Sequence, residues 1–180
     1  MTSGTTVREV ASPGALLTEA GSEPVSWACA TVSFAGVRSP AALVDPLPLE
    51  VVFTRAERIR SGSGRTVQHW AGRLAAKCAV LRLLGLDPAH RANADLLGEV
   101  EILPRPSVFC TRTTACLHGH PPGVRLPAAL RDRVETGTRI GVSISHAAST
   151  AIAVALASAP LPEDDTDRYG SDEYEDGNER

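Results

Sequence analysis

Apolar and polar positions along the chain predict one long helix and several short strands. Residues 25–37 are rich in β-branched and aromatic side chains, which favours a strand. Over residues 66–86, apolar side chains recur every three or four positions and predict a helix with a single apolar stripe, formed by Trp70, Leu74, Cys78, Leu81 and Gly85. Thr66 can cap the start of this helix, and Gly85 with Pro88 can end it.

The remaining pattern predicts a small sheet. Residues 139–157 divide into two short strands, VSIS and AIAVALA, which the polar link HAAST joins as a tight hairpin. Residues 98–103 alternate like a further strand, and residues 119–123, GHPPG, predict a turn. One helix packed on a small, mostly antiparallel sheet gives an α+β domain.

The two ends of the chain lack such patterning. Residues 1–24 are predicted to be a mobile N-terminal extension and residues 160–180 an acidic, disordered tail, which leaves 25–159 as the folded domain. From 163 to 180 there are nine acids and two bases, a net charge of −7, whereas 1–162 holds sixteen bases and twelve acids, a net +4. This modestly basic body suits an anionic partner but is not basic enough to indicate nucleic acid.

The composition limits the class of protein. Of the 180 residues, 43% are apolar and 22% charged, as in a soluble globular protein. No apolar run reaches the ~18 residues of a membrane-spanning helix, and no basic start followed by an apolar block suggests a secretory signal. Four cysteines in a chain of this length do not make a disulfide framework, so we expect reduced thiols and a cytoplasmic location.

Two cations on the predicted helix are the first candidate for chemistry. Arg73 and Lys77 are four residues apart, so their cationic ends are expected one turn apart, beside the apolar stripe. Such a pair can clamp a phosphate or pyrophosphate, and the alternative is a solvated basic face. Cys78 belongs to the stripe itself and is interpreted as a buried small hydrophobic residue, not as a nucleophile.

A second candidate lies at the end of the first hairpin strand. Alternation places Ser143 and Ser145 on one face of this strand, and Ile144 and His146 on the other. A histidine at this turn can meet a phosphate or a base, while a capping or packing role is the alternative. The sequence has no Gly-x-Ser-x-Gly elbow, which argues against a serine hydrolase.

A third candidate is a run of cysteines and histidines near residue 115. Its spacing, C-x5-C-x-H-x-H, matches no common zinc finger, ribbon or knuckle. We therefore predict no metal site from Cys110, Cys116, His118 and His120.

Several segments together resemble the 4′-phosphopantetheinyl transferases, of the short holo-acyl-carrier-protein synthase type. Residues 52–57, VFTRAE, are similar to that family's FT-x-x-E helix start, and residues 71–86, AGRLAAKCAVLRLLGL, to its signature helix. Residues 142–156, VSISHAASTAIAVAL, are similar to its closing hairpin, and Gly119-His120-Pro121 to its Gly-x-Pro turn. The resemblance covers about residues 30–157. It implies a small α+β fold that assembles as a homotrimer with active sites between subunits.

The resemblance also implies roles for individual residues. Arg73 and His146 would contact the phosphates of coenzyme A, and Ser145 with the Pro121 turn would line the same nucleotide pocket. Lys77 stands at the lysine of the family's K-E-A motif and is assigned to the catalytic centre. A downstream lysine that reaches the pyrophosphate is replaced by Arg82, which keeps the charge. The implied cofactor is coenzyme A or phosphopantetheine, and the implied partner is an acyl carrier protein or carrier domain.

The chain departs from the family at the metal site. Cys78 replaces the glutamate that ligates Mg²⁺, and by spacing Ser33 stands where the family has its aspartate ligand. Mg²⁺ prefers carboxylate oxygens, so this exchange predicts that the ion is poorly held. Losing roughly 4 kcal/mol of stabilisation slows transfer about a thousandfold. Glu50, Glu57 or Glu99 is an alternative source of a carboxylate.

Different functions are compatible with these residues. The first is a phosphopantetheinyl-transferase-like protein of polyketide, fatty-acid or peptide biosynthesis that binds coenzyme A or the pantetheine arm, with Mg²⁺-dependent transfer weak or lost. The alternative is a carrier-protein-binding protein that does not transfer. It would be a scaffold, or would act on a carrier-tethered polyketide intermediate, for example by cyclisation or dehydration. A third hypothesis is that the protein is a structural subunit that pairs with an intact paralogue or another pathway enzyme.

Overall fold

The computed structural model describes residues 26–62, 65–105 and 120–158, so the predicted extension and acidic tail lie outside the described residues. Within these ranges no helix combines the length and apolarity needed to cross a membrane. The elements in chain order are β1 (Ser26–Ser33), α1 (Pro40–Val44), α2 (Leu49–Val52), α3 (Arg55–Ser61), α4 (Val67–Leu83), the short 3₁₀ helix η1 (Arg91–Asn93), α5 (Leu96–Glu99), β2 (Glu101–Pro104), β3 (Pro122–Arg125), α6 (Ala128–Arg131), β4 (Arg139–Ala147) and β5 (Thr150–Ser158).

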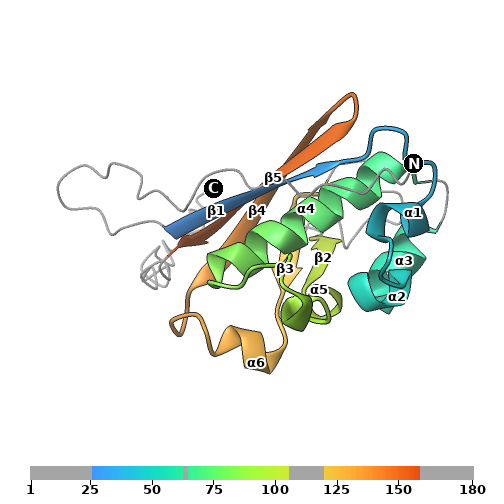
Figure 1. Ribbon diagram of the computed structural model, residues 1–180. Coiled ribbons are helices and arrows are strands. Elements are labelled where there is room, and N and C mark those ends of the chain that lie inside the picture. Colours follow the sequence, from blue (N-terminus) through green and yellow to red (C-terminus); the bar gives the residue numbers. More distant parts are fainter. Residues whose placement is uncertain (1–25, 63–64, 106–119, 159–180) are drawn as a thin grey trace, which may run out of the picture.

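The strands form one sheet in the order β1-β5-β4-β3-β2, with each neighbouring pair antiparallel (Figure 1). β5 pairs along its length with two neighbours, so Thr150 lies opposite Ser33 of β1 and Ala147 of β4. β3 joins β4 through the pair Gly123 and Gly141. Helices together with this sheet confirm the predicted α+β class.

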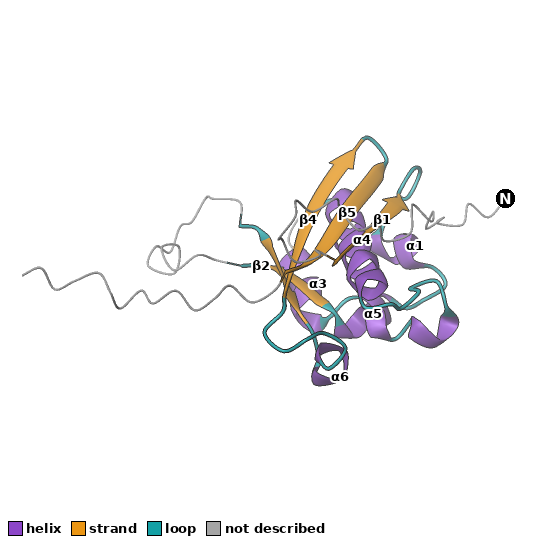
Figure 2. Cartoon of the chain, turned by 90° about the vertical axis from the view of Figure 1, so that its left-hand side faces the viewer, coloured by secondary structure: helices purple, strands orange, loops and turns teal. Residues whose placement is uncertain are grey.

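α4 lies across one face of the sheet, against β1, β5 and β4, and α1 and α5 pack on α4 in turn (Figure 2). The β5 residues on this face are Ala151, Ala153 and Ala155, all buried, so the helix can come close to the sheet. Gly72 marks a point of close approach, because a Cβ atom there would lie 2.9 Å from Cγ2 of Ile144. The core is therefore built around α4.

The structure confirms the predicted long helix and corrects its burial. α4 is followed, as expected, by Gly85, whose φ of +73° is left-handed. The N–H of Leu86 donates to the carbonyl of Leu81 at 2.9 Å, and that of Gly85 to Arg82 at 3.0 Å, which is a Schellman ending. The prediction of a single apolar stripe underestimates how much of the helix surface is buried. Every α4 residue from 70 to 81 except Arg73 is buried between the sheet and the neighbouring helices.

The predicted closing hairpin is confirmed, with longer strands than expected. β4 continues to Ala147 and β5 begins at Thr150, so that Ala148 and Ser149 alone make the turn. Pairing of the strands up to the turn places His146 beside this end of the sheet. The hairpin therefore presents its polar residues at a defined edge.

Two local predictions are corrected. The strand expected at 98–103 begins late, because its first two residues belong to α5 and β2 follows them. A Cβ atom at Gly98 would lie 2.3 Å from the carbonyl oxygen of Val51, so α5 packs closely on α2. The turn expected at 119–123 is wrong at its end, because β3 begins at Pro122.

Candidate functional site

Polar side chains gather where the start of α4 meets the β4–β5 turn. His146 lies on the face of β4 toward α4, since it pairs with the buried Ala151. Its Nδ1 is 2.5 Å from Nε2 of Gln68, in the first turn of α4. The fold thus brings together two of the motifs that are far apart in the sequence.

His69 adds a second imidazole to this place. Its Nδ1 lies 2.9 Å from Oγ1 of Thr66, which occupies the cap position before α4 but bonds this ring instead of the backbone. Partial burial lowers the pKa of His69 below 6.5, and the positive groups of Arg65, His146 and Arg73 lower it further. The ring is therefore uncharged at neutral pH, in a region of positive charge.

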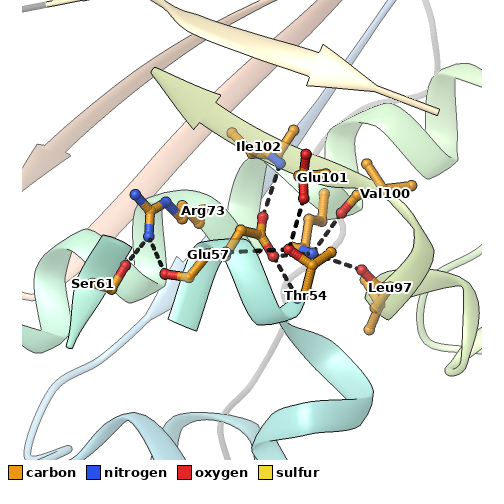
Figure 3. Close-up of polar contacts among 9 residues, drawn as sticks. Thr54, Glu57, Ser61, Arg73, Leu97, Val100, Glu101 and Ile102 are labelled. Carbon is orange, nitrogen blue, oxygen red and sulfur yellow. Dashed lines mark hydrogen bonds and ion pairs between the residues drawn. The ribbon is translucent and has the colours of Figure 1, made fainter. Parts of the chain in front are cut away.

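Arg73 is held between α4 and α3. Its Nη1 donates to the carbonyl oxygen of Glu57 at 3.2 Å and to Oγ of Ser61 (Figure 3). Burial lowers the pKa of Arg73 below its usual value, the charge of Glu57 opposes this shift, and the charges of Arg65 and Arg60 add to it. The guanidinium stays charged at neutral pH and, being fixed on two helices, can offer its planar fork to an anion.

Lys77 does not join Arg73 at this surface. Its side chain is fully buried, and Nζ is 2.7 Å from Oε2 of Glu57, 2.8 Å from the carbonyl oxygen of Leu97 and 2.5 Å from that of Val100. Burial lowers the pKa of Lys77, and the carboxylate of Glu57 opposes that shift. These contacts use all three donors of an ammonium group. The expected phosphate clamp of Arg73 and Lys77 is therefore corrected, while a catalytic role for Lys77 stays a prediction.

Glu57 is the acidic partner in this buried network. Its Oε2 accepts from the N–H of Thr54 and its Oε1 from the N–H of Ile102, both at 2.8 Å (Figure 3). Both carboxylate oxygens are thus engaged in the core, which does not suit a replacement metal ligand. Glu50 and Glu99, the other carboxylates considered, are exposed on α2 and α5, away from the β4–β5 turn.

Cys78 and Ser33 are not brought together. Cys78 is 2% exposed in the core, and burial raises the pKa of its thiol to about 12, so it stays protonated at neutral pH. Ser33 pairs with Thr150, and alternation places it on the face of β1 opposite to that of the buried Val32. Val32 and Cys78 belong to the same core cluster. The β1 residue beside Ser33 that faces the core is therefore the apolar Val32.

The other predicted cofactor residues are spread over the chain. Arg82 donates to the carbonyl of Cys29 at 2.9 Å and, nine residues after Arg73, lies roughly 13 Å further along the helix. Ser145 is exposed on the face of β4 away from α4. Pro121 precedes β3, and its carbonyl accepts from the backbone N–H of Arg105 at 2.9 Å. Within one chain, Arg73 and His146 are the two members of this set that lie near His69, in the first half of α4.

Sequence reasoning also missed residues of this site. Gln68 and Ser61 belong to no motif, although both are polar and lie close to Arg73 in the sequence or on the preceding helix. Cys110, Cys116 and His118 lie outside the described residues. In the described part of the chain, no three His, Cys, Asp or Glu side chains are grouped so as to hold a metal ion.

Comparison with known proteins identifies the fold. No family model and no curated protein matches the chain. Solved structures do, among them a Chronobacterium ammoniagenes ACPS–CoA complex, at 23% identity and a TM-score of 0.56, covering 77% of this chain and 100% of that one. The Helicobacter pylori holo-[acyl-carrier-protein] synthase in complex with coenzyme A matches at 20% identity and a TM-score of 0.52, covering 73% of this chain and 99% of that one. The Neisseria meningitidis synthase matches at 19% identity and a TM-score of 0.53, covering 73% of this chain and 96% of that one. The chain therefore has the fold of the holo-acyl-carrier-protein synthases, as the motifs implied.

Proposed function

We propose that this protein is a phosphopantetheinyl-transferase-like protein of carrier-protein biosynthesis and binds coenzyme A or a phosphopantetheine arm. The observation that carries the proposal is the position of Arg73 and His146, the two residues assigned to phosphates, near His69 in the first half of α4: His146 bonds Gln68, and both charges act on the pKa of His69. The shared fold supports it, because two of the similar structures are complexes with coenzyme A. An arginine fork and an imidazole are groups that bind phosphate oxygens.

Mg²⁺-dependent transfer to a carrier serine is proposed to be weak or lost. Mg²⁺ needs oxygen ligands in near-octahedral geometry, and the residues at the expected position do not fit it. Cys78 is a buried, protonated thiol, Val32 on the core face of β1 is apolar, and Ser33 lies on the other face of β1. Without a metal, the leaving bisphosphate lacks a stabilisation of several kcal/mol.

A second candidate function follows from the same observation. A site whose described residues include cations for phosphates but no carboxylates grouped for a metal suits a carrier-protein-binding protein that does not transfer. It would be a scaffold, or would act on a polyketide intermediate held on the phosphopantetheine arm, by cyclisation or dehydration. To distinguish the two functions, this protein is mixed with apo carrier protein, coenzyme A and Mg²⁺. The intact mass of the carrier protein then reports directly whether the phosphopantetheine arm has been added. Robust transfer at ordinary enzyme concentration would exclude the second function.

Assembly as a homotrimer with sites between subunits belongs to the first proposal. Two observations support it: Ser145 faces away from α4, and the same sheet face carries the exposed apolar side chains Ile152 and Leu156, at 39% and 38% exposure. Light scattering should then report about 57 kDa, three times 18.9 kDa. Residues 25–159 as the folded domain, flanked by a mobile extension and an acidic tail, and a cytoplasmic location are part of this proposal.

Calorimetry of coenzyme A binding tests the proposed function itself. We expect weak binding that hardly responds to Mg²⁺, and a loss of at least tenfold in affinity for Arg73→Ala, since a charge-assisted pair contributes about 1.5–3 kcal/mol. Arg91→Ala is the matched control, because Arg91 is an exposed arginine of η1. Equal loss in both variants, or no binding to the wild-type protein, would contradict the proposal.

A further inference from the structure

The imidazoles of His69 and His146 are both held through Nδ1 by groups that accept either protonation state. Thr66 Oγ1 lies 2.9 Å from Nδ1 of His69, and Gln68 Nε2 lies 2.5 Å from Nδ1 of His146. A hydroxyl can donate to a bare nitrogen or accept from N–H, and an amide can do the same by exchanging its oxygen and nitrogen. Each ring can therefore gain a proton without losing its partner, and Nε2 is the nitrogen left for a ligand.

The charged groups around His69 come from the segment before α4, from α4 and from β4. They are Arg65, Arg73 and His146, and all are positive or can become so. Arg60 and Arg65 in turn act on Arg73, and the acidic Glu57 near Arg73 is paired with the buried Lys77. Burial and these cations lower the pKa of His69, so repulsion disfavours its proton. A bound anion would reverse that balance.

We propose that Arg65, His69, Arg73 and His146 form a proton-coupled site for a polyphosphate anion, in which His69 gains a proton from solvent when the anion binds. The inference rests on the proposed function, since it names the groups that hold the diphosphate of coenzyme A. The added proton supplies positive charge at a site where the described residues group no carboxylates that could hold Mg²⁺. His69 lies outside the family motifs and becomes a binding residue of the site.

Linkage fixes the direction of the effect. An anion that binds more tightly when His69 is protonated raises the pKa of His69 in the complex. By the same coupling, lowering the pH raises the affinity of the protein for that anion. A rise of one pKa unit in the complex corresponds to about tenfold in affinity. Tenfold is the limit reached well below the pKa of free His69, which itself lies below 6.5, so we expect coenzyme A to bind about threefold to tenfold more tightly at pH 6 than at pH 8, without Mg²⁺.

The test is calorimetry on the full chain in buffers of different ionisation enthalpy, which counts the protons taken up. Coenzyme A and inorganic pyrophosphate are the probes, and wild-type protein is compared with His69→Gln, so that proton uptake by the probe itself cancels. His90→Gln is the matched control, since His90 is an exposed histidine at the start of η1. We expect greater proton uptake by wild type and His90→Gln than by His69→Gln. A second variant, Arg65→Gln, should take up fewer protons than wild type because its His69 is less repelled.

The outcomes separate this inference from the proposed function. Coenzyme A binding with equal proton uptake in wild type and His69→Gln would overturn the inference and leave the function standing. Pyrophosphate binding with His69-dependent uptake, but no tighter binding of coenzyme A, would support the inference and contradict the function. Binding of neither probe would overturn both.

Discussion

Replacing Lys77 by methionine tests the buried network at the centre of the fold. The substitution keeps an unbranched side chain in the core but removes the charge that Nζ places 2.7 Å from Glu57, along with its bonds to Leu97 and Val100. The carboxylate of Glu57 would stay buried, because the N–H groups of Thr54 and Ile102 still bind it. The variant therefore leaves an uncompensated negative charge in the interior.

The expected cost is large for one side chain. Removing one partner of a buried ion pair destabilises a protein by about 3–5 kcal/mol, against a total of about 5–15 kcal/mol for a domain. With a urea slope of ~2 kcal/mol/M, a loss of ~4 kcal/mol moves the midpoint by ~2 M. The fluorescence of Trp70, which is buried edge-on to Phe53 with centroids 4.8 Å apart, follows the transition.

Two controls make the measurement specific. Arg82→Met removes another cation of α4, whose guanidinium donates a hydrogen bond to the carbonyl of Cys29. This substitution should lower the free energy of unfolding by about 1 kcal/mol. The double variant Lys77→Met/Glu57→Gln buries no net charge, so its loss should be at least about 1 kcal/mol smaller than the sum of the single losses. Additive losses, or a loss below about 1 kcal/mol for Lys77→Met, would refute the reasoning. If Lys77 only positions α3 and α4, the folded variant still binds coenzyme A with wild-type affinity.

Further predictions concern pH, packing and assembly. The thiol of Cys78 has a pKa of about 12 in the folded protein, against a reference value of 9.0. Its contribution to the free energy of unfolding is therefore complete below pH 9 and is lost as pH rises toward 12. In urea titrations above pH 9, the free energy of unfolding of the wild type should fall more steeply than that of Cys78→Ala, by about 1.4 kcal/mol per pH unit. Gly72→Ala should cost about 1–3 kcal/mol by overpacking against Ile144, whereas Gly141→Ala, with open space at its Cβ, should be nearly neutral in the same thermal denaturation; similar losses at both would show that α4 does not approach β4 closely. Ile152→Lys should convert the proposed trimer to monomer in light scattering without lowering the unfolding midpoint, and an unchanged mass would remove this sheet face from the interface.

Local sequence signals were sufficient for much of the fold. The long helix, its left-handed glycine ending and the closing hairpin depend on contacts within a few residues, which periodicity and turn chemistry report directly. Thr54 and Glu57 form a capping box at the start of α3, which again needs only spacing. The motifs were also enough to indicate the fold of the holo-acyl-carrier-protein synthases.

Only the tertiary structure decided where the side chains of those elements lie. The spacing of Arg73 and Lys77 is that of one helix face, yet α3 and α5 cover the second residue and leave the first half-buried. Strand alternation puts Val32 and Ser33 on opposite faces of β1, but the register of β1 on β5 was needed to show that Val32 is on the core face. His69 is part of the site because the β4–β5 hairpin places His146 against the first turn of α4, where His69 lies. Sequence patterns describe each element's own geometry, whereas burial, charge neighbours and pKa depend on what packs against it.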